Sequence, residues 1–264
     1  MSTASIIIII INIALAVVLA VALTPLFVWW ERRISAFIQD RSGPNRCHIG
    51  PFRLGGIIQS FADMLKLVFK EDFTPSHIKY KFFFTIAPAI VFFCSFLTFA
   101  AIPFADVLVI DEKSHIMQAI PMELGIMWFI AFAGLSVYGI ILGGYSSGSK
   151  YGLLGSIRAS AQVISYEAAM GLAIISMLLS YGSIHLTDMV NAQAGTYLGV
   201  IPMWGIFIQP IAAVIFIICA FAETNRAPFD LAEGESELVA GYHTEYSAMK
   251  FGLFQVGEYA AMSA

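Results

Sequence analysis

Long uninterrupted runs of apolar residues alternate with short polar segments along the whole chain. Several runs reach the roughly 20 residues that an α-helix needs to cross a lipid bilayer. They are too long for strands and lack the period-two alternation of a half-buried strand. We therefore predict an all-α, polytopic membrane helix bundle, with residues 1–264 as a single transmembrane domain. The predicted spans cover residues 5–30, 80–104, 121–144, 159–181, 200–222 and 246–264.

The segment from Arg53 to Lys70 has a different pattern, because apolar residues recur at helical spacing along one face and polar residues along another. The segment is too polar to cross the membrane, so we predict an amphipathic helix that lies on its surface. Two interpretations remain open. The polar face is either simply solvated, with Asp63 and Lys66 as an ordinary helix pair, or the helix forms the wall of a lateral opening for an amphiphile.

Composition agrees with a membrane protein. Hydrophobic residues make up 59% of the chain and charged residues 12%, whereas a soluble domain carries about 25% charged residues. Of the 14 Lys and Arg residues, only Lys113 falls on one side of the predicted spans. Since basic loops favour the cytoplasmic side, we expect the N-terminus outside and residues 31–79, 145–158 and 223–245 in the cytoplasm.

The loop at residues 223–245 is the most unusual polar segment, because it is acidic on the side where basic residues are expected. A carboxylate cluster beside a membrane is costly unless it handles cations or protons. The cytoplasmic leaflet is itself negative, so we expect the loop to line a protein cavity or to face a partner. Arg226 is its one base, and its acids are Glu223, Asp230, Glu233, Glu235, Glu237 and Glu245.

Three acids belong to predicted spans. Glu167 and Glu258 fall near the middle of the bilayer, and Glu223 closes the fifth span. An acid at the bilayer centre costs about 2.5–3.5 kcal/mol on insertion scales. A single such acid can be a protonated packing residue, but three that converge on an acidic loop favour proton transfer. Glu123, near the outer end of the third span, is interpreted as structural, and Glu223 is also close enough in sequence to pair with Arg226.

No redox centre is expected on this chain. Cys47, Cys94 and Cys219 are scattered, and no Cys/His set has the spacing of metal ligands. The chain also lacks a P-loop and a glycine-rich dinucleotide motif after a strand. Any electron carriers are therefore expected on other subunits.

Four motifs together resemble one known family, the H/1 subunit of respiratory complex I, the proton-pumping NADH:quinone oxidoreductase. They are ERRISAFIQDRSGPNR at 31–46, GIIQSFADMLK at 56–66, RASAQVISYE at 158–167 and PFDLAEGESELVAG at 228–241. YHTEYSAMKFG at 242–252 looks like the bacterial form. The family usually has eight spans, and a helix that ends at Ala264 would stop in mid-bilayer with unsatisfied carbonyls. We therefore expect an incomplete sequence.

The resemblance implies a membrane subunit that forms a quinone-entrance chamber and couples quinone reduction to proton movement. The quinone-chamber residues implied are Arg32, Arg41, Asp63, Phe229, Asp230, Glu233, Glu235 and Glu237, and the proton-path residues are Glu167, Glu223 and Glu258. It further implies quinone as substrate, FMN and iron–sulfur clusters on partner subunits, and a location in the bacterial cytoplasmic membrane. The expected partners are soluble-arm and antiporter-like subunits and the lipid bilayer, and not nucleic acid.

Two other functions are considered. An energy-converting hydrogenase anchor belongs to the same superfamily and shares the basic loop and the acids without using a quinone. A stand-alone cation or proton transporter would be expected to contain broken helices or repeats, neither of which is evident in the sequence, and it would not explain the interfacial helix. The intact QDRSGPNR and PFDLAEGESE motifs favour the quinone-linked function.

Overall fold

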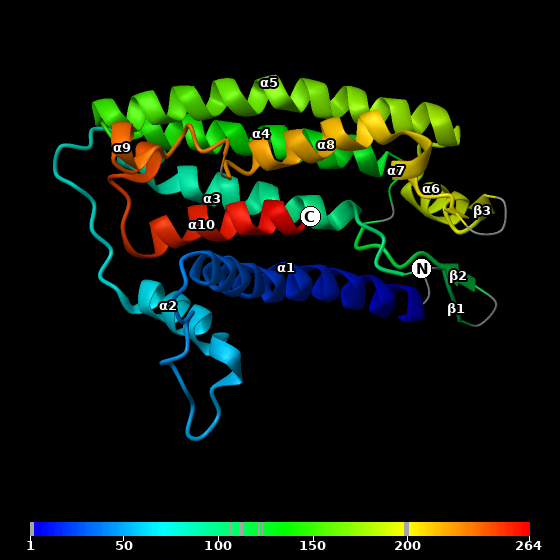
Figure 1. Cartoon of the computed structure of the whole chain (residues 1–264), viewed down its shortest axis with the longest axis horizontal. Coiled ribbons are helices and arrows are strands. Elements are labelled where there is room, and N and C mark those ends of the chain that lie inside the picture. The colour runs from blue at the N-terminus through cyan, green and yellow to red at the C-terminus, as the bar shows by residue number, and fades with distance from the viewer. Residues whose placement is uncertain are drawn as a thin grey trace.

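The computed structural model describes residues 3–105, 107–110, 113–120, 122, 124–197, 201–226 and 228–264 (Figure 1). The side chains of residues 3–5, 110, 113, 197, 201, 235 and 236 are not described. Two predicted positions are affected. Glu123 lies outside the described residues, and Glu235 is described only by its backbone.

Long apolar helices dominate the structure, as the sequence predicts. Four of them are long and apolar enough to cross a membrane. These are α1 (Thr3–Ile38), α3 (Lys81–Thr98, continued by the 3-10 turn η2 at Phe99–Ala101), α4 (Gly125–Ser146) and α5 (Lys150–Tyr181). Two shorter helices, α8 (Pro210–Glu223) and α10 (Ala248–Ser263), pack beside them. The chain is therefore an all-α, polytopic membrane protein.

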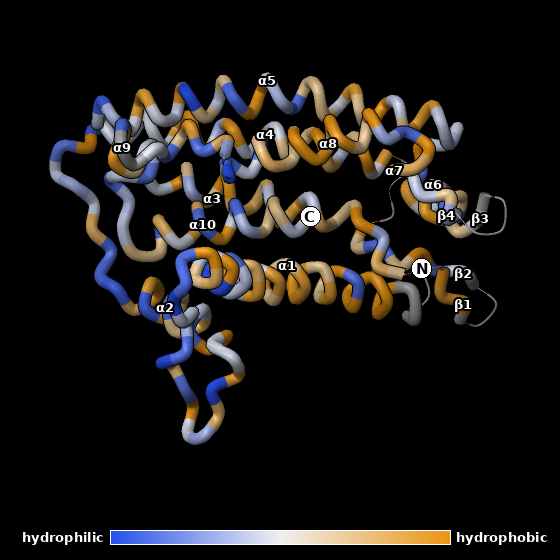
Figure 2. The backbone as a smooth tube through the Cα atoms, viewed as in Figure 1, coloured by the Kyte–Doolittle hydropathy of each residue, from blue (hydrophilic) through white to orange (hydrophobic). Residues whose placement is uncertain are grey.

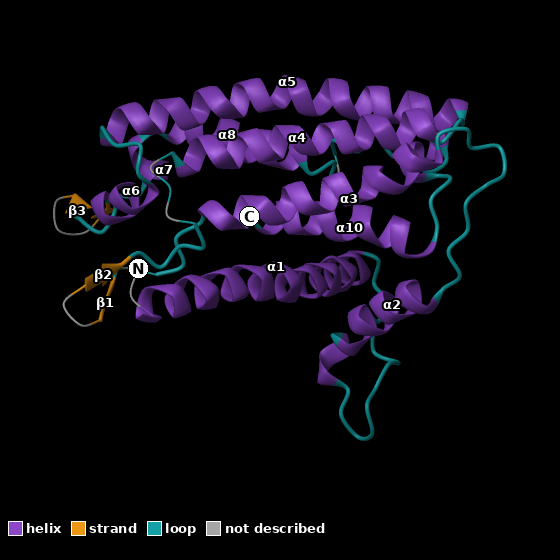
Figure 3. Cartoon of the chain, turned by 180° about the vertical axis from the view of Figure 1, so that it is seen from behind, coloured by secondary structure: helices purple, strands orange, loops and turns teal. Residues whose placement is uncertain are grey.

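Short elements connect these helices. At one end of the bundle lie η1 (Leu54–Gly56), α2 (Ile58–Phe69), α9 (Glu235–Leu238) and η3 (Gly241–His243). At the other end lie α6 (Leu186–Ala192), α7 (Gly205–Ile208) and two antiparallel hairpins, which the sequence did not indicate. The hairpins are formed by β1 (Leu108–Ile110) with β2 (Lys113–His115), and by β3 (Thr196–Tyr197) with β4 (Ile201–Pro202). Figures 1 and 3 show the two sets of elements at opposite ends.

Helix α1 continues to Ile38 instead of ending near residue 30, and two other helices begin at residues that differ from the sequence-based expectation. Helix α5 begins at Lys150 rather than near 159, because the turn before it at Gly148 has a left-handed φ of +66° and ends α4. The amphipathic helix begins at Ile58 because Gly55 and Gly56 adopt φ of +62° and +96°. A side chain at Gly56 would place its Cβ 1.7 Å from the Pro44 carbonyl oxygen, so the turn requires glycine.

The fifth predicted span is divided at Gln209 into α7 and α8 (Figure 1). Pro210 begins α8 and supplies no N–H, which separates the two helices. The Gln209 side chain fills the break: its Oε1 accepts from Ser176 Oγ at 2.6 Å, and its Nε2 donates to the Ser176 carbonyl at 3.1 Å. The broken helix is thus held to α5 by a satisfied amide.

Helix α3 lies at the centre of the bundle, against both α4 and α10. Small residues allow the close approach that membrane helices favour. A Cβ added at Gly139 of α4 would lie 2.8 Å from the Ala87 carbonyl oxygen of α3. Apolar residues line the helices and polar residues gather at the end with α2 and α9 (Figure 2).

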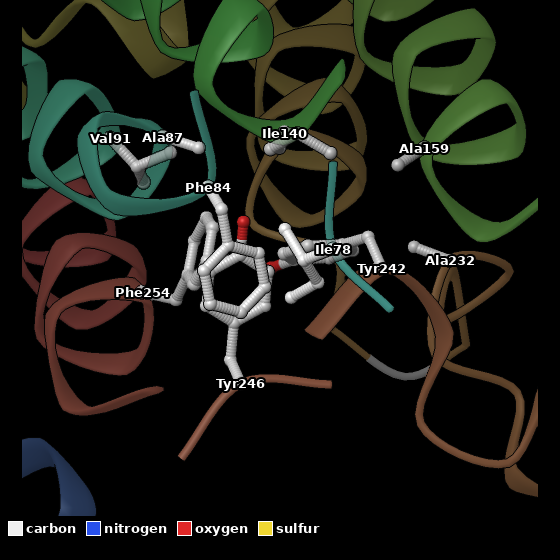
Figure 4. Close-up of a cluster of buried hydrophobic side chains, with 10 residues drawn as sticks. All are labelled: Ile78, Phe84, Ala87, Val91, Ile140, Ala159, Ala232, Tyr242, Tyr246 and Phe254. Carbon is white, nitrogen blue, oxygen red and sulfur yellow. The ribbon is translucent and has the colours of Figure 1, made fainter. Parts of the chain in front are cut away.

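The largest buried cluster lies near that polar end and joins segments far apart in sequence (Figure 4). Phe84 of α3 stacks on Tyr246 with ring centroids 4.1 Å apart, and Phe254 of α10 meets Tyr246 edge-on at 4.9 Å. Tyr242, from the acidic loop, is fully buried in the same cluster. The core therefore holds the acidic loop directly against the membrane helices.

Candidate functional site

A cavity of about 860 Å³ lies between the end of α1 and the loop that follows it. Trp29, Trp30, Ile34 and Phe37 contribute apolar surface, whereas the other lining residues are polar or belong to the turn. These are Arg33, Arg41, Ser42, Gly43, Pro44 and Asn45. An apolar wall beside two guanidinium groups suits an amphiphile with a polar head.

A second cavity of about 430 Å³ also includes Arg41 and the turn at residues 42–45, together with Arg32, Arg46 and Gln59. Arg32 forms an ion pair with Asp63 of α2, and Gln59 Nε2 donates to the same carboxylate at 3.2 Å. The three predicted residues Arg32, Arg41 and Asp63 are therefore gathered at the junction of α1 and α2. Asp63 thus joins α2 to α1, and both side chains of the pair remain partly exposed.

The junction is also held from α1. Trp29 Nε1 and Arg33 Nη1 each donate to the Gly55 carbonyl oxygen at 3.0 Å. Because Gly55 belongs to η1, immediately before α2, these bonds set the angle at which α2 leaves the bundle. The predicted surface helix is thus fixed to the first span by side chains from both elements.

Some side chains of the acidic loop make contacts at the protein surface, and others make contacts in its interior. Glu237 of α9 accepts from Arg158 of α5 at 2.6 Å, and both side chains remain partly exposed. Glu233 Oε1 lies 2.9 Å from His243 Nε2, and the histidine side chain is largely buried. Phe229 is tied to α5, since its carbonyl accepts from Gln162 Nε2 at 2.8 Å and its ring meets Tyr166. Asp230 also interacts with its surroundings.

Tyr242 connects the acidic loop to α10. Its hydroxyl donates to Glu258 Oε1 at 2.5 Å. Burial raises the pKa of Tyr242 well above its ordinary value, and the charges of Glu258 and Glu233 raise it further. The hydroxyl therefore keeps its proton and acts as a fixed donor between loop and membrane.

Arg226 has a different partner from the one its sequence position suggests. Among the described residues it pairs with Glu31 of α1, Nη1 to Oε1 at 3.2 Å, rather than with Glu223. Its guanidinium lies over the Tyr259 ring at 4.3 Å, a cation–π contact. Tyr259 in turn donates to Glu31 Oε2 at 2.7 Å. These contacts join α1, the acidic loop and α10.

The three acids that were predicted to form a proton path lie on helices of the bundle. Glu223 and Glu258 both line a cavity of about 370 Å³ between α3, α4, α5, α8 and α10, which also includes Ser95, Thr98 and Asn225. Glu167 of α5 faces Gly134 of α4, where an added Cβ would lie 2.5 Å from Glu167 Oε1. Glu167 and Glu223 are close enough to interact electrostatically. The three acids are therefore contributed by three helices, α5, α8 and α10.

Several residues of this network were missed by reasoning from the sequence, namely Glu31, Tyr242, His243 and Tyr259. Glu31 and Tyr259 are separated by 228 positions, so no local spacing relates them. ERRISAFIQD contains Glu31 and YHTEY contains Tyr242 and His243, and these motifs were the available indication, whereas Tyr259 belongs to neither. Ser160, seven residues before Glu167 in α5, donates to the carbonyl of Ile157 in its own helix.

The Glu233–His243 pair predicts a pH-dependent stability. Burial lowers the pKa of His243, but Glu233 and the charge of Glu258 raise it more, so the net shift is upward. A raised pKa in the folded state stabilises the fold below the unfolded value near 6.5. This stabilisation is lost as the pH rises through the folded value.

Glu233→Gln is therefore expected to lower the Tm of the purified complex most at pH below about 6.5. The difference from the unaltered protein should shrink as the pH rises above that value. Thermal unfolding across this pH range tests it, with Glu237→Gln, whose partner Arg158 keeps its charge throughout, as the control. A Tm difference independent of pH would contradict the pairing.

Comparison with known proteins reveals extensive similarity. A family model described as NADH dehydrogenase matches residues 10–264. An H-type NADH-quinone oxidoreductase subunit from Geobacter metallireducens is 48% identical over 248 residues, which is 94% of this chain and 71% of the relative. The H-type NADH-quinone oxidoreductase subunit from Flavobacterium psychrophilum is 43% identical over 257 residues, which is 96% of this chain and 71% of the relative. NADH-quinone oxidoreductase subunit 8 from Rhodothermus marinus is 48% identical over 248 residues, which is 94% of this chain and 68% of the relative.

Proposed function

Since this chain belongs to the NADH dehydrogenase family and is a subunit of an oxidoreductase complex, we propose that it forms a quinone-entrance chamber and couples quinone reduction to proton movement. Other subunits of an NADH:quinone oxidoreductase are its partners. They supply the electrons, from FMN and iron–sulfur clusters, and this chain supplies the route for quinone and protons.

The 860 Å³ cavity at the end of α1 supports the chamber. Its tryptophan and phenylalanine side chains match an isoprenoid tail, and the guanidinium groups of Arg33 and Arg41 match polar quinone oxygens. Helix α2, fixed by the Arg32–Asp63 pair, forms the adjoining wall. The chamber is completed by partner subunits in this proposal, since the headgroup is reduced by carriers outside this chain.

The observation that carries the coupling proposal is the Tyr242–Glu258 hydrogen bond of 2.5 Å. It joins the loop that contains the Glu233–His243 pair to the cavity that contains Glu258 and Glu223. Reducing a quinone to a quinol adds electrons and protons in equal number. Protons drawn from the chamber side would change the charge of the loop, and Tyr242 would transmit that change to Glu258.

Sidedness follows from the same proposal. The basic loop after α1, the start of α5 and the acidic loop lie at one end of the bundle, and the N-terminus lies at the other (Figures 1 and 3). This grouping supports a cytoplasmic position for the loops and an outer position for the N-terminus. We propose the bacterial cytoplasmic membrane as the location.

A transporter remains the contrasting hypothesis, because the break between α7 and α8 is a feature that transporters share. In transporters, such breaks present unwound backbone groups to an ion. Here the Gln209 amide fills the break and bonds to Ser176. The break is therefore better explained as a packed joint than as an ion site.

Arg41→Gln tests the chamber. In membranes that contain the assembled complex, we expect the KM for a short-chain quinone to rise about tenfold, because a hydrogen bond to a charged group contributes about 1.5–3 kcal/mol. NADH oxidation by an artificial acceptor should be unchanged. Arg53→Gln is the matched control, since Arg53 is exposed and contributes to neither cavity. Equal KM values for both variants would reject the chamber.

A further inference from the structure

Residues 71–80 join α2 to α3, and we call this segment the connector. Lys250 of α10 holds the connector to the helix bundle. Lys250 Nζ lies 3.0 Å from Asp72 Oδ2 and donates to Thr74 Oγ1 at 2.8 Å. It also lies 5.3 Å from the centroid of the Phe84 ring. Its side chain is only 11% exposed. This lysine therefore points into the protein instead of reaching for the membrane surface.

The position of Lys250 is unfavourable unless these partners hold it. It lies in the first turn of α10, where the helix dipole disfavours a positive charge. An ammonium group taken out of water is also costly without a paired charge and hydrogen bonds. Lys and Arg that merely anchor a span at the membrane surface keep the charged group in water. The contacts with Asp72 and Thr74 of the connector therefore offset the cost of placing the Lys250 ammonium group here.

Two further contacts hold the connector against the acidic loop. Ile78 is 3% exposed and belongs to the buried cluster with Tyr242 and Phe254 (Figure 4). A ring nitrogen of His77 lies 3.1 Å from the Ser147 carbonyl oxygen, and the same nitrogen lies 3.9 Å from Glu245 Oε2. The connector therefore contributes Ile78 to the same buried cluster as Tyr242, the residue that donates to Glu258.

Helix α2 itself rests on the same part of α10. A Cβ added at Gly252 would lie 3.3 Å from Leu67 Cδ1, so Leu67 packs on the glycine two residues beyond Lys250. The Lys250–Asp72 ion pair and this Gly252–Leu67 contact lie two residues apart, within one turn of α10. Together they determine where α2 lies relative to the helix that contains Glu258.

We propose that Lys250 is a positioning residue that holds the connector and α2 against α10, and so ties the wall of the quinone chamber to the acid network. This inference rests on the function proposed above. It identifies the connector as the element that joins the quinone chamber to the acid network. Displacement of α2 by a quinone would pull on α10 through Lys250 and on Tyr242 through Ile78.

The test compares Lys250→Met, Asp72→Asn and the double variant in membranes with the assembled complex. Lys250→Met should raise the KM for a short-chain quinone about fivefold and leave artificial-acceptor NADH oxidation unchanged. Asp72→Asn should raise KM less, and the double variant should resemble Lys250→Met alone, because the two residues act as one pair. Lys250→Arg should restore most of the affinity. Lys79→Met is the matched control, since Lys79 is an exposed lysine of the same connector.

A second measurement tests directly whether the connector is held in place. Hydrogen exchange of the amides at residues 71–80 should be faster in purified complex with Lys250→Met, and unchanged with Lys250→Arg. Additive KM effects, or exchange equal to that of the unaltered protein, would overturn the positioning role. Should Lys250→Met fail to assemble, Asp72→Asn at its exposed partner gives both readouts.

The two proposals fail separately. If Arg41→Gln raises KM and Lys250→Met does not, the chamber stands and the positioning role is wrong. If Arg41→Gln leaves KM unchanged, the chamber is wrong, and hydrogen exchange in the connector still decides whether Lys250 holds α2.

Discussion

Glu258→Gln is expected to lower quinone-linked proton translocation at least tenfold, while NADH oxidation by an artificial acceptor is retained. The substituted amide has nearly the same shape and still accepts from Tyr242, but it cannot bind and release a proton. A positioned acid or base typically contributes a factor of about 10²–10⁴ to proton transfer. Proton uptake per quinone reduced, measured in sealed inverted vesicles, is the readout.

The control is Asp188→Asn, which removes an exposed carboxylate at the opposite end of the bundle. It should leave proton translocation unchanged. Normal translocation in the Glu258→Gln complex would show that the acid in the 370 Å³ cavity is a packing residue, and the coupling route through Tyr242 would be wrong.

Gly155→Val is expected to disturb both stability and coupling. A Cβ at Gly155 would lie 2.8 Å from both Gly241 Cα and Tyr242 N, which are backbone atoms that cannot move aside without moving the loop. Overpacking of this kind costs about 1–3 kcal/mol. The displaced Tyr242 would lose its bond to Glu258, so quinone-linked proton translocation should fall together with Tm.

Gly171→Val is the matched control, because Gly171 belongs to the same helix and an added Cβ there meets nothing within 4 Å. Tm of the purified complex and proton uptake in vesicles are measured for both variants. If the Gly155 and Gly171 variants behave alike, the close contact between α5 and the acidic loop does not hold Tyr242 in place.

The helices were predictable because the local sequence of each one is enough to indicate it. An apolar run of about 20 residues becomes a helix in a membrane whatever surrounds it, since the backbone must satisfy its own hydrogen bonds. The periodic pattern of residues 58–69 likewise identified α2. The break at Gln209 was not predictable from hydropathy, because Ile208 and Ile211 on either side continue the apolar run.

The candidate site was only partly predictable, for a related reason. Arg32, Asp63, Glu223 and Glu258 stood out as charges in or beside apolar segments, and the structure gathers them into two places. His243 and Tyr242 did not stand out, because a histidine and a tyrosine near a membrane surface are ordinary. Their importance depends on partners, Glu233 and Glu258, that the chain brings close only after folding.

By itself, the sequence determined that the chain is a bundle of membrane helices, that one amphipathic helix follows the first span, and that acids occur where acids are costly. These properties depend on neighbouring residues and on the energy of moving side chains between water and lipid. Tertiary structure alone decided that Arg226 pairs with Glu31, that Lys250 holds the connector, and that Tyr242 bonds to Glu258. Each pairing joins segments that only helix packing brings within a few ångströms, a range over which hydrogen bonds and ion pairs act.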